Sequence, residues 1–121
     1  MTPILFTASA KHEEARAFYG EVMGFVLTDD NPFSFEFDAA GTMLWVQKVE
    51  EFAAHPFTQI GWGVNDIVGE RDRLVEHGAE FLRFEFMEQD ERDIWTAPDG
   101  AKICWFRDPD GNTLSLTQRA E

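Results

Sequence analysis

One stretch near the C-terminus, residues 104–118, restricts the fold of this chain more than any other. Its middle carries the run DPDGN at 108–112. Proline presets the backbone angle φ for a turn, glycine accepts positive φ, and aspartate or asparagine side chains bond to the local backbone. After this run, Leu114 and Leu116 alternate with polar residues, which is typical of a strand with one apolar and one polar face. The stretch therefore predicts a hairpin of two strands.

The rest of the chain predicts two similar halves joined by a linker at 50–57. In the first half, apolar residues recur at helical spacing over 12–23, and Gly24 ends the helix. Strands are predicted around this helix at 3–9, 25–29, 33–38 and 42–49. The second half repeats the order with a strand at 59–64, a helix capped by Asn65 or Asp66, and strands near 80–87, 101–107 and 113–118. The order βαβββ therefore occurs twice.

Three motifs in this order resemble the vicinal-oxygen-chelate (VOC) superfamily, which includes glyoxalase I, extradiol dioxygenases, fosfomycin-resistance enzymes and bleomycin-resistance proteins. They are AFYGEVMGF at 17–25, IGWGVNDI at 60–67 and FRDPDGNTLSL at 106–116. The resemblance implies an α+β fold in which two βαβββ modules form a curled mixed sheet around a ligand cavity. A single domain is expected, with module one at about 1–49 and module two at about 58–121. The small bleomycin-resistance-like members are the most similar in length.

The resemblance also implies where a metal ion would bind in metal-dependent members. The matching positions hold Ile4 (or Leu5, because the first strand aligns loosely), Trp45, Gln59 and Ser115. A hydrocarbon and an indole offer no lone pair to a divalent cation, and one amide with one hydroxyl cannot replace a full ligand set. We therefore expect no metal and no other cofactor.

The remaining reactive side chains do not form a familiar catalytic pattern. His12, His55 and His77 share no strand face and no metal-binding spacing, and we expect structural or surface roles for them. Cys104 lies in a predicted strand and is expected to be a buried, inert thiol. No serine–histidine–acid arrangement and no glycine-rich phosphate loop is visible.

Alternation along the strands separates a core face from a pocket face. Leu44, Val46, Ile60, Leu114 and Leu116 are uniformly apolar and should lie under the helices. The opposite parity mixes polar and aromatic groups, as the lining of a binding pocket does. Trp45 there offers an indole face for stacking or cation–π contact, worth roughly 0.5–2 kcal/mol. The ligand-binding residues that we predict are Phe6, Phe35, Phe37, Trp45, Gln47, Gln59, Trp95 and Ser115.

Two features of this pocket stay open at the level of sequence. Trp95 lies in a polar segment and is interpreted either as a lid over a cationic ligand or as a buried anchor for its loop. Alternation does not say which way the nearby acids point; these are Glu36, Asp38, Glu85 and Glu88.

The charge of the chain limits its partners. Ten basic and twenty-three acidic residues give a net charge of −13, which disfavours nucleic acid and anionic membranes and favours cationic or neutral partners. The alternative is that the acidity only keeps the protein in solution. No apolar run approaches the roughly 20 residues needed to span a bilayer, and no secretory signal is apparent at the N-terminus. With a single cysteine, this predicts a cytoplasmic protein.

Together these features predict a metal-independent small-molecule-binding protein. It would be similar to bleomycin-resistance proteins, sequestering a cationic or aromatic compound, with antibiotic resistance as the implied role. The alternative is an enzyme, a glyoxalase-like lyase or isomerase or a dioxygenase with an atypical site. A third reading is a sensor or stabilising partner whose cavity is filled by its own side chains. Open sheet edges and the family resemblance predict a homodimer.

Overall fold

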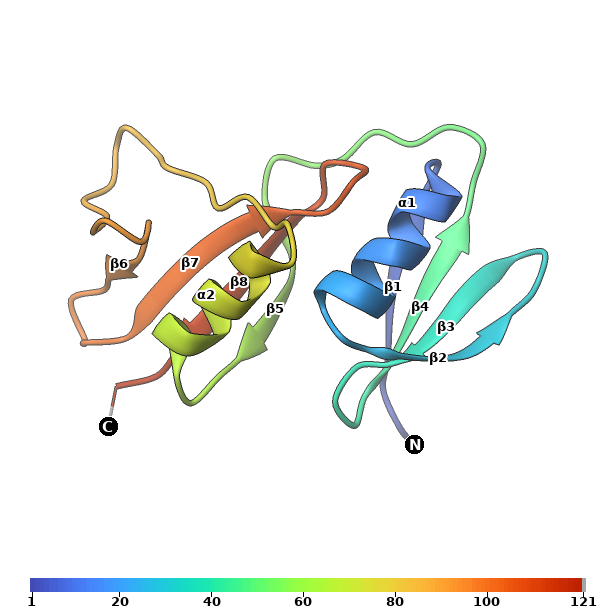
Figure 1. Ribbon diagram of the computed structural model, residues 1–121, viewed down its shortest axis with the longest axis horizontal. Coiled ribbons are helices and arrows are strands. Elements are labelled where there is room, and N and C mark those ends of the chain that lie inside the picture. The colour runs from blue at the N-terminus through green and yellow to red at the C-terminus, as the bar shows by residue number, and fades with distance from the viewer. Residues whose placement is uncertain (121) are drawn as a thin grey trace. The chain divides into compact units, whose positions relative to one another are not determined.

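The computed structural model describes residues 1–120, and these form two compact units, each with its own four-stranded mixed sheet (Figure 1). The first unit contains residues 1–54 and the turn 108–111. The second contains residues 55–107 and the chain from residue 112 onward. The predicted α+β class and the two-module arrangement are confirmed. Residue 121, the end of the predicted second module, lies outside the described part.

The first unit follows the predicted order closely. Its sheet has the strand order β1-β4-β3-β2, with β1 parallel to β4 and the other pairs antiparallel. Its elements are β1 (Ile4–Ser9), α1 (His12–Ala17), η1 (Phe18–Val22), β2 (Val26–Asp30), β3 (Ser34–Asp38) and β4 (Met43–Lys48). The predicted single helix over 12–23 is α-helical only in its first part. It continues as the π-type turn η1, in which the amide of Met23 donates to the carbonyl of Phe18 at 2.9 Å.

A core of aromatic and aliphatic side chains holds the helix on this sheet. Phe37 and Leu44 are directly opposed across β3 and β4, and both are fully buried. The ring of Tyr19 lies 6.1 Å from that of Phe37. Each such buried side chain contributes about 1.5–3 kcal/mol through removal of apolar surface from water.

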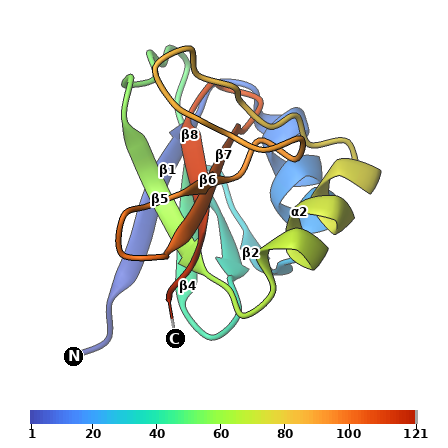
Figure 2. The same cartoon turned by 90° about the vertical axis from the view of Figure 1, so that its left-hand side faces the viewer.

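The second unit repeats the helix-on-sheet arrangement. Its elements are β5 (Thr58–Gly63), α2 (Ile67–Glu76), β6 (Trp95–Thr96), β7 (Lys102–Arg107) and β8 (Thr113–Gln118). The strand order is β5-β8-β7-β6, and α2 lies on one side of the sheet (Figure 2). Asp66, and not Asn65, is the N-cap of α2, because its carboxylate accepts from the amide of Gly69 at 3.1 Å. No helix within residues 1–120 has the length and apolarity to span a membrane.

The predicted strand at 80–87 is wrong. Only Phe81 makes a bridge to β7, and the following residues form a loop with a turn after Phe84. The side chain of Gln89 bonds to the amide of Phe84 and to the carbonyl of Leu82. Because these backbone groups are satisfied by a side chain, no neighbouring strand is needed to pair with them. The strand that does form here is the two-residue β6.

The turn between β7 and β8 belongs to the first unit. The carboxylate of Asp108 is buried and accepts from the hydroxyl of Tyr19 at 2.6 Å. Asp110 accepts from the amides of Ala10 and Lys11 at 2.8 and 3.2 Å, just before α1 begins. The turn therefore anchors the segment that leads into α1, about a hundred residues earlier in the chain.

This arrangement has a matched internal control. The tripeptide Pro-Asp-Gly occurs twice, at 98–100 and 109–111, and both glycines have positive φ. Within residues 1–120, the Asp99 side chain bonds to the nearby amide of Ala101 alone, whereas the Asp110 side chain bonds to Ala10 and Lys11. Asp110→Ala should lower the free energy of unfolding in urea by about 1–2 kcal/mol, because two backbone amides lose a carboxylate acceptor. Asp99→Ala should cost less than about 0.5 kcal/mol. Equal costs for the two variants would contradict the anchoring role of Asp110.

Candidate ligand-binding surface

The sheet of the first unit presents an aromatic pair on the face opposite its helix. Phe6 and Trp45 are partners across β1 and β4, and their rings meet edge to face at 5.6 Å. Phe6 is 47% exposed, and Trp45 is partly buried. The exposed Gln47 lies on the same face, two residues further along β4. Phe6, Trp45 and Gln47 thus share one face of the sheet, and their role in ligand binding stays a prediction.

The indole of Trp45 has an unused hydrogen-bond donor. Its Nε1 atom is buried and has no acceptor among residues 1–120. Leaving a buried donor unpaired costs about 1–3 kcal/mol, so an acceptor atom brought to this point would recover part of that cost. The two acids of β3 lie on this face as well, since Glu36 pairs with Trp45 and Asp38 with Met43. The face therefore combines aromatic surface, an indole N–H group and carboxylates.

Phe35 and Phe37 were also predicted to bind ligand, and the structure places them elsewhere. They pair with Val46 and Leu44, so they share the core face under the helix, where they are 2% and 0% exposed. Residues directly opposed on antiparallel strands point to the same side of the sheet. Assigning Leu44 and Val46 to the core already required Phe35 and Phe37 to be there. We remove both from the candidate site.

The second unit has a comparable face opposite α2. Ser115 is 6% exposed and is flanked by Gly61 on β5 and Trp105 on β7. A Cβ atom at position 61 would lie 2.6 Å from the Ser115 hydroxyl, so a larger residue there would require that hydroxyl to move. Gln59 is half-buried, and the strand register shifts between Thr58 and Ile60. Alternation along β5 therefore does not assign the Gln59 side chain to this face.

Trp95 is part of a wall of aromatic rings and not of a free lid. It lies in β6, paired with Ile103, and its ring is 6.3 Å from that of Trp105. Trp105 also contacts Phe84 edge to face at 5.7 Å and donates from Nε1 to the hydroxyl of Thr58 at 3.2 Å. Sequence reasoning missed Trp105, although it has the same parity as Ser115 on the neighbouring strand. Pairing the strands β7 and β8 at the sequence level would have placed Trp105 opposite Ser115, on the same face of the sheet.

The other reactive side chains have structural roles. Burial raises the pKa of the Cys104 thiol to about 12, so the reactive thiolate is disfavoured at neutral pH. His12 bonds to the carbonyl of Val49, and His77 bonds to the carbonyl of Arg73 at the end of α2. Burial, and then the nearby Asp108 carboxylate, raise the pKa of Tyr19 well above its usual value. Its hydroxyl therefore keeps the proton that it donates to Asp108.

Two shallow depressions lie away from these faces. One, of about 350 Å³, lies beside α1 and is lined by Glu13, Arg16, Ala17, Gly20, Glu21, Leu27 and Phe37. The other, of about 390 Å³, is lined by Gly63, Val64, Asn65, Thr117, Gln118 and Arg119. Of the predicted site residues, only the buried Phe37 borders either of them.

Comparison with known proteins assigns the chain to a family. The model of the glyoxalase-like domain family matches residues 4–117. The chain belongs to this family. Comparison with curated proteins finds no significant match. The motifs noted in the sequence and the repeated βαβββ order agree with membership in the VOC superfamily.

Solved structures share the fold over nearly the whole chain. A glyoxalase/bleomycin resistance protein/dioxygenase from Alicyclobacillus acidocaldarius matches with a TM-score of 0.78 at 17% identity, covering 100% of this chain and 92% of the other. A glyoxalase family protein from Bacillus anthracis gives 0.76 at 19%, covering 99% and 95%. A lactoylglutathione lyase from Agrobacterium tumefaciens gives 0.72 at 17%, covering 98% and 92%. At this level of identity the similarity shows the fold alone.

The side chains at the positions that the resemblance assigns to a metal do not suit one. On the first unit these are Ile4 and Trp45, and neither offers a metal-binding lone pair. Within residues 1–120, no group of three or more histidine, cysteine, aspartate or glutamate side chains is arranged to hold a metal ion. The donor set therefore does not fit the metal chemistry of the superfamily.

The two sheet faces should respond differently to truncation. Leu116 is 3% exposed and lies on the core face of the second sheet. Trp45 lies on the face of the first sheet that points away from the core, and it is partly exposed. Leu116→Ala should lower the free energy of unfolding by about 2–5 kcal/mol. Trp45→Ala should cost less, because part of its surface is already in water. Denaturant melts of the two variants test this, and an equal loss would place Trp45 in the core.

Proposed function

We propose that this protein binds a small aromatic molecule without the help of a metal ion. The observation that supports this most is Trp45, an indole at a position that the family resemblance assigns to a metal ligand. Its ring pairs with the exposed ring of Phe6, and its buried N–H group has no acceptor. A flat ligand with an acceptor atom would cover the rings and satisfy that donor.

Charge favours a cationic ligand over an anionic one. The chain carries a net charge of −13, and Glu36 and Asp38 lie on the same sheet face as Trp45. Such a field attracts cations, and it is screened over about 10 Å at 0.1 M salt. Sequestration of a cationic aromatic compound, as a bleomycin-resistance-like protein would do, fits this surface. The cytoplasmic location stays a prediction.

The alternative is a lyase, isomerase or dioxygenase with an atypical site. A lactoylglutathione lyase shares this fold, so the fold is compatible with an enzyme. The side chains at the implied metal positions do not favour one, because Ile4 and Trp45 cannot take part in metal-assisted catalysis. The metal content of the purified protein separates the two proposals.

The test is a thermal-shift screen of neutral, cationic and anionic aromatic compounds, followed by titration of any compound that raises the melting temperature. Trp45→Ala should weaken binding by roughly 1–3 kcal/mol. Treatment with EDTA should change neither the melting temperature nor the affinity. Elemental analysis showing about one metal ion per chain after dialysis would support the enzymatic alternative instead. Failure of every aromatic compound to bind would contradict the proposed function.

We also propose that the protein is a homodimer. Each sheet has open edge strands, β1 and β2 in the first unit and β5 and β6 in the second. Exposed edges and exposed apolar side chains such as Val26 are commonly covered by a partner. Light scattering at micromolar concentration should give about twice the chain mass of 13.9 kDa. A mass of one chain would contradict the dimer.

A further inference from the structure

We propose that the loop between α2 and β6 builds a separate aromatic binding surface within the second unit, and that Gln89 is the residue that positions it. This proposal rests on the proposed function and names a further binding surface and its ligand class. The aromatic wall consists of Phe84 and Phe86 on the loop, Trp95 on β6 and Trp105 on β7. The ligand that it fits is a planar aromatic cation.

The rings of the wall are in contact with one another and open to solvent on one side. Phe84 contacts Trp105 at 5.7 Å and Phe86 at 5.5 Å, and Trp95 contacts Trp105 at 6.3 Å. Phe86 is 80% exposed, so it extends the cluster of rings to the surface. Adjoining rings with one exposed member form a platform on which a flat molecule can stack.

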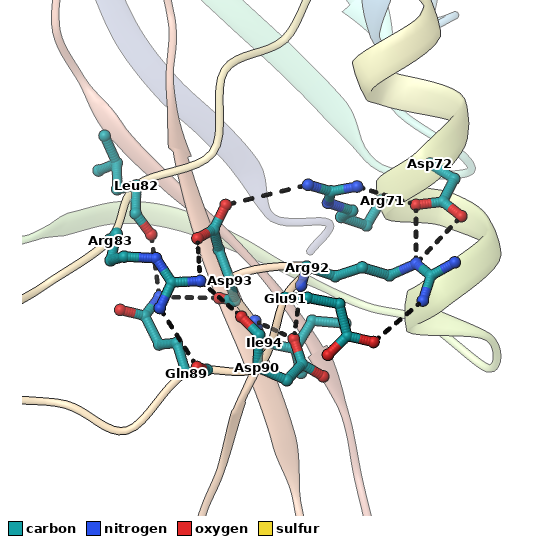
Figure 3. A network of polar contacts seen from close by, with 10 residues as sticks. All are labelled: Arg71, Asp72, Leu82, Arg83, Gln89, Asp90, Glu91, Arg92, Asp93 and Ile94. Atoms are coloured by element: carbon teal, nitrogen blue, oxygen red, sulfur yellow. Dashed lines mark hydrogen bonds and ion pairs between the residues drawn. The ribbon is translucent and has the colours of Figure 1, made fainter.

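The side chain of Gln89 bonds to three backbone groups of the loop that carries Phe84 and Phe86. It accepts from the amide of Phe84 at 2.7 Å. It donates to the carbonyls of Leu82 and Asp93 at 2.9 and 2.8 Å (Figure 3). All of its polar contacts are thus to the backbone of its own loop. Gln89 also bridges to Trp95 through its backbone. One residue therefore connects the two phenylalanines to the strand that bears Trp95.

Ion pairs close the same loop and join it to α2. Arg83 donates to the carbonyl of Asp90 at 2.6 Å and pairs with the carboxylate of Asp93 at 2.8 Å. Asp93 has a φ of 63°, a left-handed conformation that is uncommon for aspartate. Arg92 bonds to Asp72 on α2 at 3.2 Å (Figure 3). The loop is thus an ordered part of the second unit, and its rings are presented before any ligand arrives.

The charged side chains beside the wall favour a positively charged ligand. Glu85 lies between Phe84 and Phe86 in the chain, and Glu88 precedes Gln89; both are exposed. Neither forms an ion pair with any residue of the described part, 1–120. The nearest cation in the loop, Arg83, is paired with Asp93. Aromatic faces attract cations, and the free carboxylates add to this attraction.

The experiment uses proflavine, a planar aromatic cation, titrated into the full chain with fluorescence as the signal. The matched pair of variants is Phe86→Ala and Phe33→Ala, since both side chains are 80% exposed but lie in different units. Phe86→Ala should weaken proflavine binding about 5- to 50-fold, the usual range for a lost stacking contact. Phe33→Ala should leave it unchanged. Equal affinities for the two variants, or no binding of proflavine at all, would overturn the proposal.

The role of Gln89 is tested with a double variant. If Gln89 acts by positioning Phe86, removing Gln89 should cause no further loss of proflavine affinity once Phe86 is already gone. Gln89→Ala should weaken proflavine binding as much as Phe86→Ala does, and the double variant should bind no more weakly than either. Thermal melts of each variant give the change in stability separately. Additive losses in affinity would show that Gln89 does not act through the wall.

The charge is tested by replacing Glu85 and Glu88 with glutamine. The pair of substitutions should weaken proflavine binding and reduce its salt dependence, whereas Glu14→Gln in the first unit should do neither. If Phe86→Ala changes the oligomeric mass but not the affinity, Phe86 contacts a second copy and the proposal is wrong. If anionic 2-naphthalenesulfonate binds through Trp45 while proflavine does not bind, the proposed function stands and this inference falls.

Discussion

Two buried or partly buried carboxylates hold the first unit together. Asp108 is 6% exposed and accepts from the Tyr19 hydroxyl, and Asp110 accepts from the amides of Ala10 and Lys11, just before α1. A buried carboxylate is costly unless it is hydrogen-bonded, and backbone amides that lie outside regular structure need acceptors. Each need is met by the other, so a turn late in the chain and a helix early in the chain depend on one another. The core face of the first sheet then packs on this helix through Tyr19 and Phe37.

The packing of the helices determines which sheet face is left for a ligand. In both units one face of the sheet is buried beneath a helix, and the opposite face carries aromatic and polar side chains. Trp45 and Phe6 occupy this second face in the first unit, and Trp105 and Ser115 occupy it in the second. The same strands therefore supply stability with one set of side chains and binding chemistry with the other. This separation lets Trp45 stand at an implied metal position while its neighbours Leu44 and Val46 remain in a closely packed core.

The loop after α2 replaces a predicted strand and exposes aromatic side chains that a strand would have presented differently. Repetition of the module predicts a strand at 80–87, but a single glutamine satisfies two of the backbone groups that such a strand would have paired, the carbonyl of Leu82 and the amide of Phe84. The released segment carries Phe84, whose ring contacts Trp105, and Phe86, whose ring contacts Phe84. The ion pairs of Arg83 and Arg92 order the segment without a regular sheet.

The sequence by itself determined the features that depend on local pattern. Alternation and helical spacing predicted most strands, both helices and the buried Leu44 and Leu116, since side-chain period is a property of the chain. The turn at 108–111 was also visible there. Only the tertiary structure decided features that depend on pairing between distant segments. Cross-strand register moved Phe35 and Phe37 to the core and brought Trp105 beside Ser115. Likewise, the two Pro-Asp-Gly turns are identical in sequence, and only the contacts of Asp110 with residues far away in the chain give it a role that Asp99 lacks.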